Sequence, residues 1–338
     1  MNKAIEILRD PIKKKALSRS GDYLVSEGGD KFSIDGKFIN FLEGQNNKNE
    51  ATDKEATFRW EHSTRLEQDD KFIQHQFDDF LKRYGFENDR DFSKFLENVK
   101  TIAEIGAGEG RLVDWFLKYS DATIYALEIS DSTKYLKQKY EKTDRVIVIK
   151  ADALYHPFAD GSIDLLSCEQ SIHHTDQPGI IFDALANCLA PAGRVLLSIY
   201  AQKSPIREKF DCIIREGIAK LSSEEKHEVS KKITDIGRIL SEIDVDVEIP
   251  ADFTEFGDLK GESMSLQRFI YFAVMKCFWN NDFSYDKCVE FNHDWYSYPV
   301  CNTVSPEDAK GWFSANQINI DHIDVNHANV NLRGIVKH

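Results

Sequence analysis

The sequence has no cysteine before Cys168 and no two cysteines at C-x-x-C spacing. Its six cysteines therefore cannot form the local pairs of a zinc ribbon, and their scatter argues against a disulfide scaffold. No apolar run approaches the roughly 18 residues that a membrane-spanning helix needs. The N-terminal residues lack the apolar block of a signal peptide. We therefore expect a cytoplasmic protein with no membrane span and no bound metal.

Basic residues are in the minority. The chain has 43 lysines and arginines against 57 acidic residues, which gives a net charge of −14. Such a field repels a phosphate backbone, so we expect no nucleic-acid partner. The densest basic run, Lys13-Lys14-Lys15, is typical of a solvated chain end.

The first half of the chain changes its periodicity twice. Within residues 1–50, two β-prone runs flank Gly28-Gly29-Asp30, which is a hairpin signal, and the polar stretch 44–57 indicates a linker. Residues 51–200 begin with helical spacing. From residue 100 onward, short apolar runs alternate with helical segments, and these runs lie at 101–105, 123–129, 146–150, 163–168 and 194–200.

The second half loses the strand signal and later regains it. Within residues 201–304, helical patterns cover 205–220, 223–242 and 264–279. Residues 305–338 begin with a helix capped by Ser305 and end in two β-like runs, near 318–325 and 330–337.

Strands that are apolar on both faces and alternate with helices indicate a parallel sheet covered by helices. We therefore predict a doubly wound α/β fold with a seven-stranded, mostly parallel sheet. Residues 1–50 would be a small β-containing extension, 51–200 the core, 201–304 a helical insertion and 305–338 the return to the sheet.

The strongest motif is the loop Glu104-Ile105-Gly106-Ala107-Gly108-Glu109-Gly110, between a strand and a helix. Glycines let the backbone approach a ligand closely, and a helix N-terminus offers free N–H groups. A dinucleotide fingerprint, G-x-G-x-x-G, would need a third glycine where Arg111 stands. A glutamate beside the loop would repel a pyrophosphate but suits a ligand with an ammonium group. The spacing thus disfavours a dinucleotide.

This loop resembles the first motif of the class I S-adenosylmethionine-dependent methyltransferases, an acidic residue followed by G-x-G-x-G, and the resemblance extends over residues 88–200. It implies S-adenosylmethionine as the cofactor. Glu128 would bind the ribose hydroxyls and Asp152 the adenine amino group, while Glu169 would face the methionine end. The residues implied in cofactor binding are Glu104, Gly106, Ala107, Gly108, Gly110, Glu128, Asp152, Ala153 and Glu169.

After the fourth strand come His173 and His174, and many members of this family that act on small molecules have a similar pair there. Ligands bind at this carboxyl edge of such sheets. A hydroxyl or activated-carbon acceptor needs a base, and the pKa of histidine suits that task. We therefore take His174, His173 and Glu169 as candidate catalytic residues. The alternative for the histidines is a capping or packing role.

The segment Asn292–Pro299 groups charged residues with aromatics, and with Tyr200 and Ile206-Arg207-Glu208 it resembles a bacterial subset of the family. Because caps at strand ends carry specificity, we expect it to bind the substrate. The candidate substrate-binding residues are Tyr200, Arg207, His293, Asp294 and Tyr296. The alternative is that the aromatics form the core of the cap.

We expect an enzyme that transfers a methyl group from S-adenosylmethionine to a small molecule, such as a metabolite, sugar or lipid-like acceptor, by in-line displacement. Residues 201–304 would then be the cap that holds the acceptor. The alternatives are a methyltransferase that acts on a macromolecule and a non-catalytic binding subunit with this fold. The N-terminal module resembles modules that carry zinc-binding C-x-x-C pairs, which this sequence lacks; it would pack, or close the cofactor site with Phe58-Arg59-Trp60. The sequence leaves the oligomeric state open.

Overall fold

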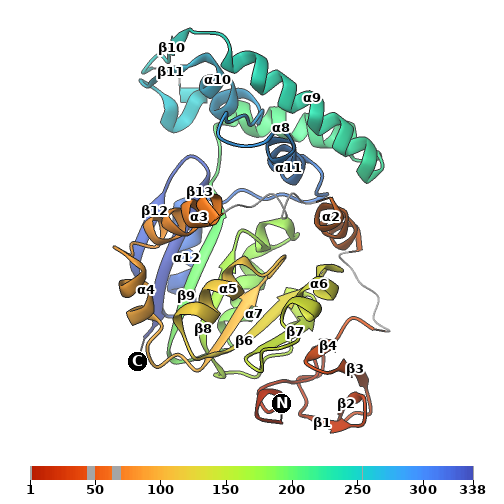
Figure 1. Cartoon of the computed structure of the whole chain (residues 1–338). Helices are drawn as coiled ribbons and strands as arrows, with labels where there is room; N and C mark the ends of the chain where they lie inside the picture. Colours follow the sequence, from red (N-terminus) through yellow and green to blue (C-terminus); the bar gives the residue numbers. More distant parts are fainter. Residues whose placement is uncertain (1, 44–49, 63–69, 253, 338) are drawn as a thin grey trace.

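The computed structural model describes residues 2–43, 50–62, 70–252 and 254–337. One large sheet of eleven strands lies at its centre, in the order β1-β2-β3-β4-β7-β6-β5-β8-β9-β13-β12 (Figure 1). The strands are β1 (Leu17–Ser20), β2 (Tyr23–Ser26), β3 (Lys31–Asp35), β4 (Phe38–Asn40), β5 (Thr101–Ile105), β6 (Thr123–Glu128), β7 (Val146–Lys150), β8 (Ile163–Glu169), β9 (Leu189–Tyr200), β12 (Ile318–Val325) and β13 (Asn329–Val336).

The α/β fold with a mostly parallel core is confirmed, but the predicted count of seven strands is wrong. Strands β4 to β9 pair in parallel, and β13 lies antiparallel between β9 and β12. The four N-terminal strands extend the sheet because β4 pairs with β7, with Phe38 opposite Val148. An apolar edge strand such as β7 exposes unpaired backbone groups, and β4 covers them. A hairpin signal does not say which distant strand the hairpin will join.

The strands of the core lie where the apolar runs predict them, because each run is buried on both faces. The helices around the sheet are α1 (Asn2–Ile5), α2 (Glu50–Glu61), α3 (Asp70–Arg83), α4 (Asp89–Phe95), α5 (Arg111–Tyr119), α6 (Ser132–Lys139), α7 (Pro178–Ala186) and α12 (Pro306–Ala315), with short 3₁₀ turns η2 (Ala153–Tyr155) and η3 (Ile172–His174). Ser305 caps α12 as predicted, since its side chain accepts from the Asp308 N–H.

The linker prediction for 44–57 is wrong from Glu50 onward, where α2 begins, and residues 44–49 lie outside the described part. This helix has no apolar periodicity. Tertiary contacts hold it: Phe58 is buried, and Glu55 forms a buried ion pair of 2.6 Å with Lys226 of the insertion. The polar sequence therefore gives no sign of this helix, because contacts with a distant segment stabilise it.

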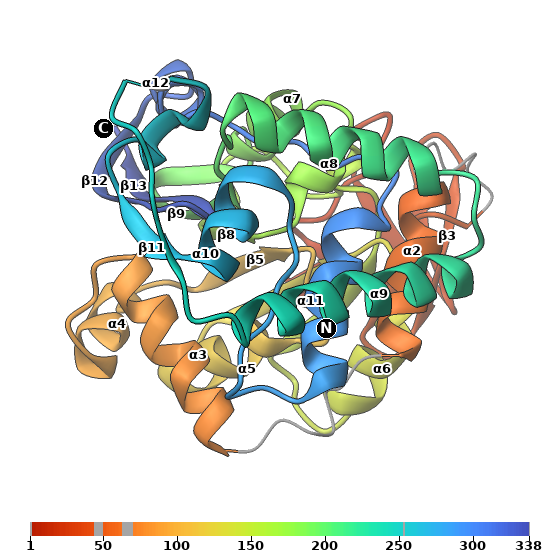
Figure 2. The ribbon, with the colours of Figure 1, turned by 90° about the horizontal axis from the view of Figure 1, so that it is seen from above.

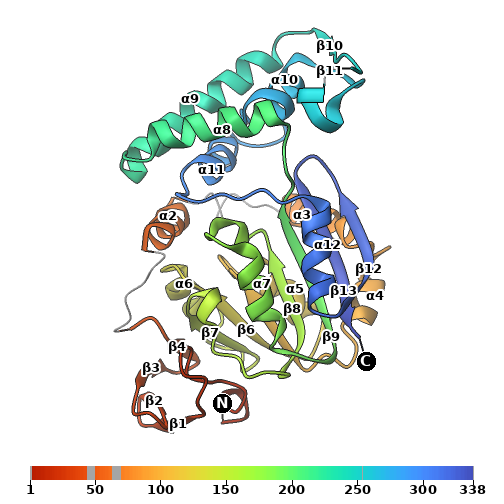
Figure 3. The same cartoon turned by 180° about the vertical axis from the view of Figure 1, so that it is seen from behind.

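Helices cover both faces of the sheet (Figure 3). The core on one face takes its residues from α7 and α12, including Phe182 and Phe313. The core on the other face takes them from α3, α4, α5 and α6, including Phe80, Phe92 and Phe116. The sheet is thus doubly wound, as expected.

Residues 201–304 form a layer above the carboxyl ends of the parallel strands, seen from the side in Figure 1 and from above in Figure 2. Its elements are α8 (Pro205–Ile218), α9 (Ser223–Ser241), β10 (Asp246–Glu248), the 3₁₀ turn η4 (Thr254–Leu259), β11 (Ser263–Ser265), α10 (Leu266–Phe269), a π-helical turn η5 (Ile270–Val274) and α11 (Tyr285–Tyr296). The helix predicted over 264–279 therefore ends early. The backbone of Met275 is extended. The Tyr271 carbonyl accepts a hydrogen bond from Arg207 in place of the one that a continued helix would donate.

This layer has its own small core, which includes Ile218, Ile233, Cys277 and Trp295 and reaches Tyr200 at the end of β9. We call residues 201–304 the cap. In the part of the chain that is described, no helix combines the length and the apolar character needed to cross a membrane.

Candidate functional site

The glycine loop joins β5 to α5 directly below the cap. Gly106, Gly108 and Gly110 have φ angles of 74°, 53° and 83°, which other residues rarely adopt. A Cβ on Gly106 would lie 2.3 Å from Cβ of Ser171, so this turn packs tightly on the loop after β8. A Cβ on Gly108 would meet only the Gly106 carbonyl oxygen, at 3.9 Å. The backbone at Gly108 therefore faces open space, as a ligand cradle requires.

Glu128 ends β6 beside this loop, and its carboxylate is buried. Its Oε2 accepts a hydrogen bond from the Gly108 N–H at 2.9 Å, and its Oε1 accepts from the Ser130 N–H at 2.8 Å. The side chain is thereby fixed with the glycine loop on one side. Each carboxylate oxygen can accept further hydrogen bonds, so Glu128 can also receive hydroxyl donors from a ligand.

Asp152 follows β7 at the same edge of the sheet. Its Oδ1 accepts from the Leu154 N–H at 2.9 Å and so caps the turn that contains Ala153. Ala153 and Leu154 pack partly against the core beneath them. The carboxyl ends of three neighbouring strands, β5, β6 and β7, thus carry the residues that the resemblance implied for cofactor binding.

Glu104 is buried inside β5, and its Oε2 has no hydrogen-bond partner within the described ranges. Burial, together with the nearby charge of Glu169, raises its pKa well above the usual value. A buried acid with an unpaired oxygen fits a ligand that brings a positive group, as S-adenosylmethionine does, because such a group would favour the ionised form. The open backbone at Gly108 and the fixed Glu128 fit the same cofactor.

Glu169 ends β8 and is engaged by Arg83, the last residue of α3, and by Tyr84, which follows it. Its Oε1 lies 2.6 Å from an Arg83 nitrogen, and its Oε2 accepts from the Tyr84 hydroxyl at 2.5 Å. Arg111 at the start of α5 lies 4.0 Å away. Sequence reasoning missed Arg83 and Tyr84, because nothing in a helical pattern shows that this face of α3 meets the end of β8.

The two histidines have different surroundings. His173 is fully buried, stacks on Tyr200 at 3.7 Å between ring centroids, and has no partner for either ring nitrogen among the described residues. Burial, with neighbouring positive groups, lowers its pKa well below the usual value. It is therefore a neutral ring with an unused donor and an unused acceptor.

His174 stacks on Tyr298 at 3.9 Å, and its Nδ1 lies 3.2 Å from the Val300 carbonyl oxygen. A carbonyl only accepts, so Nδ1 carries the proton and Nε2 presents the lone pair. Burial lowers its pKa to about 4, against a smaller opposite effect of Asp294. At neutral pH, His174 is therefore uncharged, with a defined acceptor nitrogen.

Asp294 on α11 joins the cap to the sheet and to α2. Its Oδ2 accepts from the Tyr200 hydroxyl at 3.3 Å, and its Oδ1 lies 3.2 Å from an Arg59 nitrogen. Burial opposes its charge, but Arg59, His174 and Lys276 together lower its pKa. Arg59 also lies 4.0 Å from Glu290 of α11, so it links α2 to the cap.

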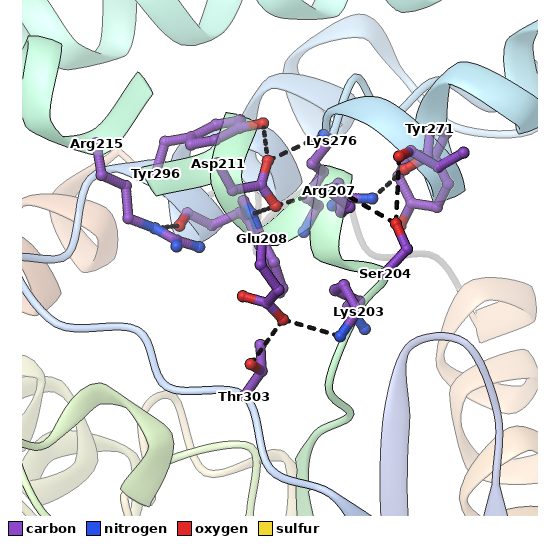
Figure 4. A network of polar contacts seen from close by, with 12 residues as sticks. Lys203, Ser204, Arg207, Glu208, Asp211, Arg215, Tyr271, Lys276, Tyr296 and Thr303 are labelled. Carbon is purple, nitrogen blue, oxygen red and sulfur yellow. Dashed lines mark hydrogen bonds and ion pairs between the residues drawn. The ribbon is translucent and has the colours of Figure 1, made fainter. Parts of the chain in front are cut away.

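Arg207 and Tyr296 lie inside the cap, where both bind Asp211 (Figure 4). Arg207 forms an ion pair of 2.6 Å with this buried carboxylate, and the Tyr296 hydroxyl donates to it at 2.6 Å. Trp295 Nε1 donates to it at 2.8 Å. The polar ends of Arg207 and Tyr296 are thus already occupied. Asp211 was missed because one acidic residue on an amphipathic helix gives no signal.

His293 is also buried, but on the side of α11 that faces α9 and α2. Its Nδ1 lies 3.4 Å from the Ser230 hydroxyl, and its ring centroid is 5.3 Å from that of Phe58. The structure thus brings His173, His174, Tyr200 and Asp294 together, and it places His293 apart from them.

Comparison with known proteins agrees with this geometry. Residues 103–197 match the family model of the methyltransferase domain. Among curated proteins, the methyltransferase GfsG of Streptomyces halstedii is 23% identical over 126 residues, which are 36% of this chain and 45% of that protein. The match therefore spans less than half of the length of that relative. The predicted class I S-adenosylmethionine-dependent methyltransferase domain is confirmed.

Two solved structures of methyltransferases show a distant resemblance to this chain. The 1,6-didemethyltoxoflavin-N1-methyltransferase of Burkholderia thailandensis, solved with bound 1,6-didemethyltoxoflavin and S-adenosylhomocysteine, has a TM-score of 0.41 at 10% identity. The match covers 74% of this chain and 76% of that one. The magnesium protoporphyrin IX methyltransferase of Synechocystis has a TM-score of 0.43 at 12% identity and covers 86% of this chain and 98% of its own. These TM-scores are too low to support an assignment, so the assignment of the methyltransferase domain rests on the family model.

Proposed function

We propose that this chain transfers a methyl group from S-adenosylmethionine to a small-molecule acceptor held between the cap and the carboxyl ends of the strands. One observation carries the proposal: His174, Tyr200 and Asp294 come from three separate elements and meet beneath the cap. They lie near the glycine loop, because Ser171, which precedes the turn that contains His174, packs on Gly106. The proposed cofactor residues and acceptor residues would therefore face one another.

Cofactor binding is assigned to the loop Gly106–Gly110 and to the acidic residues around it. Glu128 would receive the ribose hydroxyls, and Asp152 and Ala153 would hold the adenine. The positive end of the ligand would lower the raised pKa of Glu104, so that Glu104 would then supply a negative charge beside it. Bound S-adenosylmethionine supplies an electrophilic methyl group that an in-line nucleophile can take. Arg83 forms an ion pair of 2.6 Å with Glu169 and would hold this side chain at the end of β8.

His174 is the candidate general base. The Val300 carbonyl fixes its tautomer, so that Nε2 can receive a proton from the acceptor. His173 lacks such an orienting partner in the described residues, and both carboxylate oxygens of Glu169 are engaged. His173 would position the acceptor by packing, with Tyr200 beneath it.

The burial of the candidate acceptor residues supports a small-molecule acceptor. His174 and Tyr200 are each only 8% exposed, and Tyr298 is 5% exposed. A folded macromolecule could not bring a target atom to these groups unless the cap moved away. Exclusion of water by the cap would also favour methyl transfer.

Two measurements test the proposal. Calorimetry should show binding of S-adenosylhomocysteine and no binding of NAD, and the reverse would contradict the cofactor assignment. Incubation with methyl-labelled S-adenosylmethionine and a cell extract should place the label in the low-molecular-weight fraction. Label in precipitated protein or RNA would instead favour a macromolecular acceptor. Cofactor binding with no transfer to any fraction would favour a non-catalytic subunit.

A further inference from the structure

Four cations surround a single indole ring in the cap. The side chains of Lys276, Arg215, Arg207 and Lys203 lie 4.8, 5.1, 5.4 and 5.6 Å from the ring centroid of Trp295. Lys203 precedes α8, Arg207 and Arg215 lie on it, and Lys276 follows η5. Figure 4 shows Arg215 and Lys276 on opposite sides of Asp211 in that view.

The nearby carboxylates offset only part of this positive charge. The Asp211 carboxylate already accepts hydrogen bonds from the side chains of Arg207, Trp295 and Tyr296 and from the backbone N–H of Lys276. Glu208 accepts from the Thr303 hydroxyl at 2.7 Å and from the Lys203 backbone N–H at 2.8 Å. Asp294 attracts Lys276 from a distance, but its own ion pair is with Arg59.

Lys276 and Arg215 are therefore left without an ion pair in the described part of the chain. Lys276 is only 8% exposed. One terminal nitrogen of Arg215, Nη2, is buried without a hydrogen-bond partner, although its Nε donates to the Trp295 carbonyl at 3.1 Å. A buried charge without a counter-charge is costly, and contact with an aromatic ring recovers only part of that cost.

The pKa values agree with this excess of positive charge. Burial, followed by the charge of Arg207, lowers the pKa of Lys203 to about 7. Burial lowers the pKa of Lys276 to about 8, with Arg207 acting in the same direction against Asp294. An anion bound among these groups would reverse both changes.

We propose that Lys276 and Arg215 form a binding site for the anionic group of the acceptor, a carboxylate or a phosphate. Arg215 offers its unused Nη2 donor and Lys276 its ammonium group. This rests on the proposed function and narrows its substrate class to anionic small molecules.

The position of the site relative to His174 suits such an acceptor. Trp295 packs on Tyr200 with ring centroids 4.7 Å apart, Tyr200 stacks on His173, and the His173 and His174 ring centroids are 4.3 Å apart. A molecule anchored by its anionic group among the cations would extend along this row of rings toward the Nε2 atom of His174. The anion would thereby fix which atom of the acceptor meets the methyl group.

The test is the thermal midpoint of the full chain, saturated with S-adenosylhomocysteine, in inorganic phosphate, acetate or chloride at constant ionic strength. Phosphate or acetate should raise the midpoint in a saturable way beyond chloride, because a ligand that binds only the folded state stabilises it. A response to phosphate alone supports a phosphoryl group, and a response to acetate alone supports a carboxylate. The same midpoint in all three salts would overturn the inference.

Lys276→Met and Arg215→Met should each raise the half-saturating anion concentration at least tenfold. Lys209→Met is the matched control, since Lys209 is an exposed cation on α8 and should leave the response unchanged. In chloride, Lys276→Met should unfold at the same temperature as the wild type or higher, because it removes a buried unpaired charge. An equal loss of response in Lys209→Met, or a lower midpoint for Lys276→Met in chloride, would contradict the proposal.

Two separate readouts distinguish failure of the proposed function from failure of the anion site. If S-adenosylhomocysteine does not bind, the methyltransferase proposal fails, and the anion titration is done on the ligand-free chain. If S-adenosylhomocysteine binds and no anion does, only the anionic substrate class is wrong.

Discussion

The Gly108 N–H and the Glu128 carboxylate, 20 residues apart in sequence, form a hydrogen bond of 2.9 Å. The residue that would hold the ribose therefore also fastens the loop that would hold the rest of the cofactor. Two neighbouring parallel strands bring these groups together, because Ile105 at the end of β5 pairs with Leu127 near the end of β6. We therefore expect cofactor affinity and local stability to be coupled at this position.

Glu128→Ala should weaken S-adenosylhomocysteine binding about tenfold to a hundredfold, because it removes charge-assisted hydrogen bonds of roughly 1.5–3 kcal/mol. It should also lower the unfolding midpoint, because the N–H groups of Gly108 and Ser130 lose their acceptor. Glu128→Gln keeps one acceptor oxygen, so its affinity and its unfolding midpoint should lie between those of the wild type and those of Glu128→Ala. Calorimetry that shows full affinity in Glu128→Ala would place the ribose elsewhere.

Arg83→Met should destabilise the protein by about 3–5 kcal/mol, because it leaves the Glu169 carboxylate buried without its cation. Asp79→Asn is the control: it breaks the other ion pair of Arg83, but the Asp79 side chain is 54% exposed. Such a pair contributes about 1 kcal/mol or less. Urea unfolding of both variants measures the two losses of stability. Equal losses would mean that the ion pair with Glu169 contributes no more than the exposed pair with Asp79.

His174→Asn should reduce turnover about a hundredfold or more while S-adenosylhomocysteine binding stays the same. The asparagine amide can still donate to the Val300 carbonyl, so the loop should keep its position, but the Nε2 lone pair is gone. Because the pKa of His174 is about 4, the acidic limb of the rate profile in the wild type should lie well below pH 6. A limb near pH 6.5, or normal turnover in His174→Asn, would argue for another base.

Acid should destabilise the fold between about pH 6.5 and pH 4. Burial lowers the pKa of His156 to about 4, and the same holds for His174 and His293. In this window the unfolded chain binds protons that the folded chain does not, so the free energy of unfolding falls as the pH falls. His156→Gln, distant from the candidate base, should make the dependence shallower. Unfolding midpoints measured across this range provide the check, and an unchanged slope in His156→Gln would contradict it.

The local elements and the cofactor motif could be read from the sequence because their signals are local. Five apolar runs between residues 101 and 200 correspond to β5 to β9, and the glycine loop lies between β5 and α5 as its residues indicate. Strand burial and left-handed glycine turns depend on neighbouring residues in the chain, so a pattern of residue types reveals them.

Tertiary structure alone decided which distant groups meet. The pairing of β4 with β7, the packing of polar helix α2 against the cap, and the ion pair between Arg83 and Glu169 all join segments that are far apart in sequence. The same is true of the cations around Trp295. Each of these contacts depends on which face of an element turns inward once the whole chain has packed. The residue types supply the charges and rings, and the fold determines which of them are left without a partner.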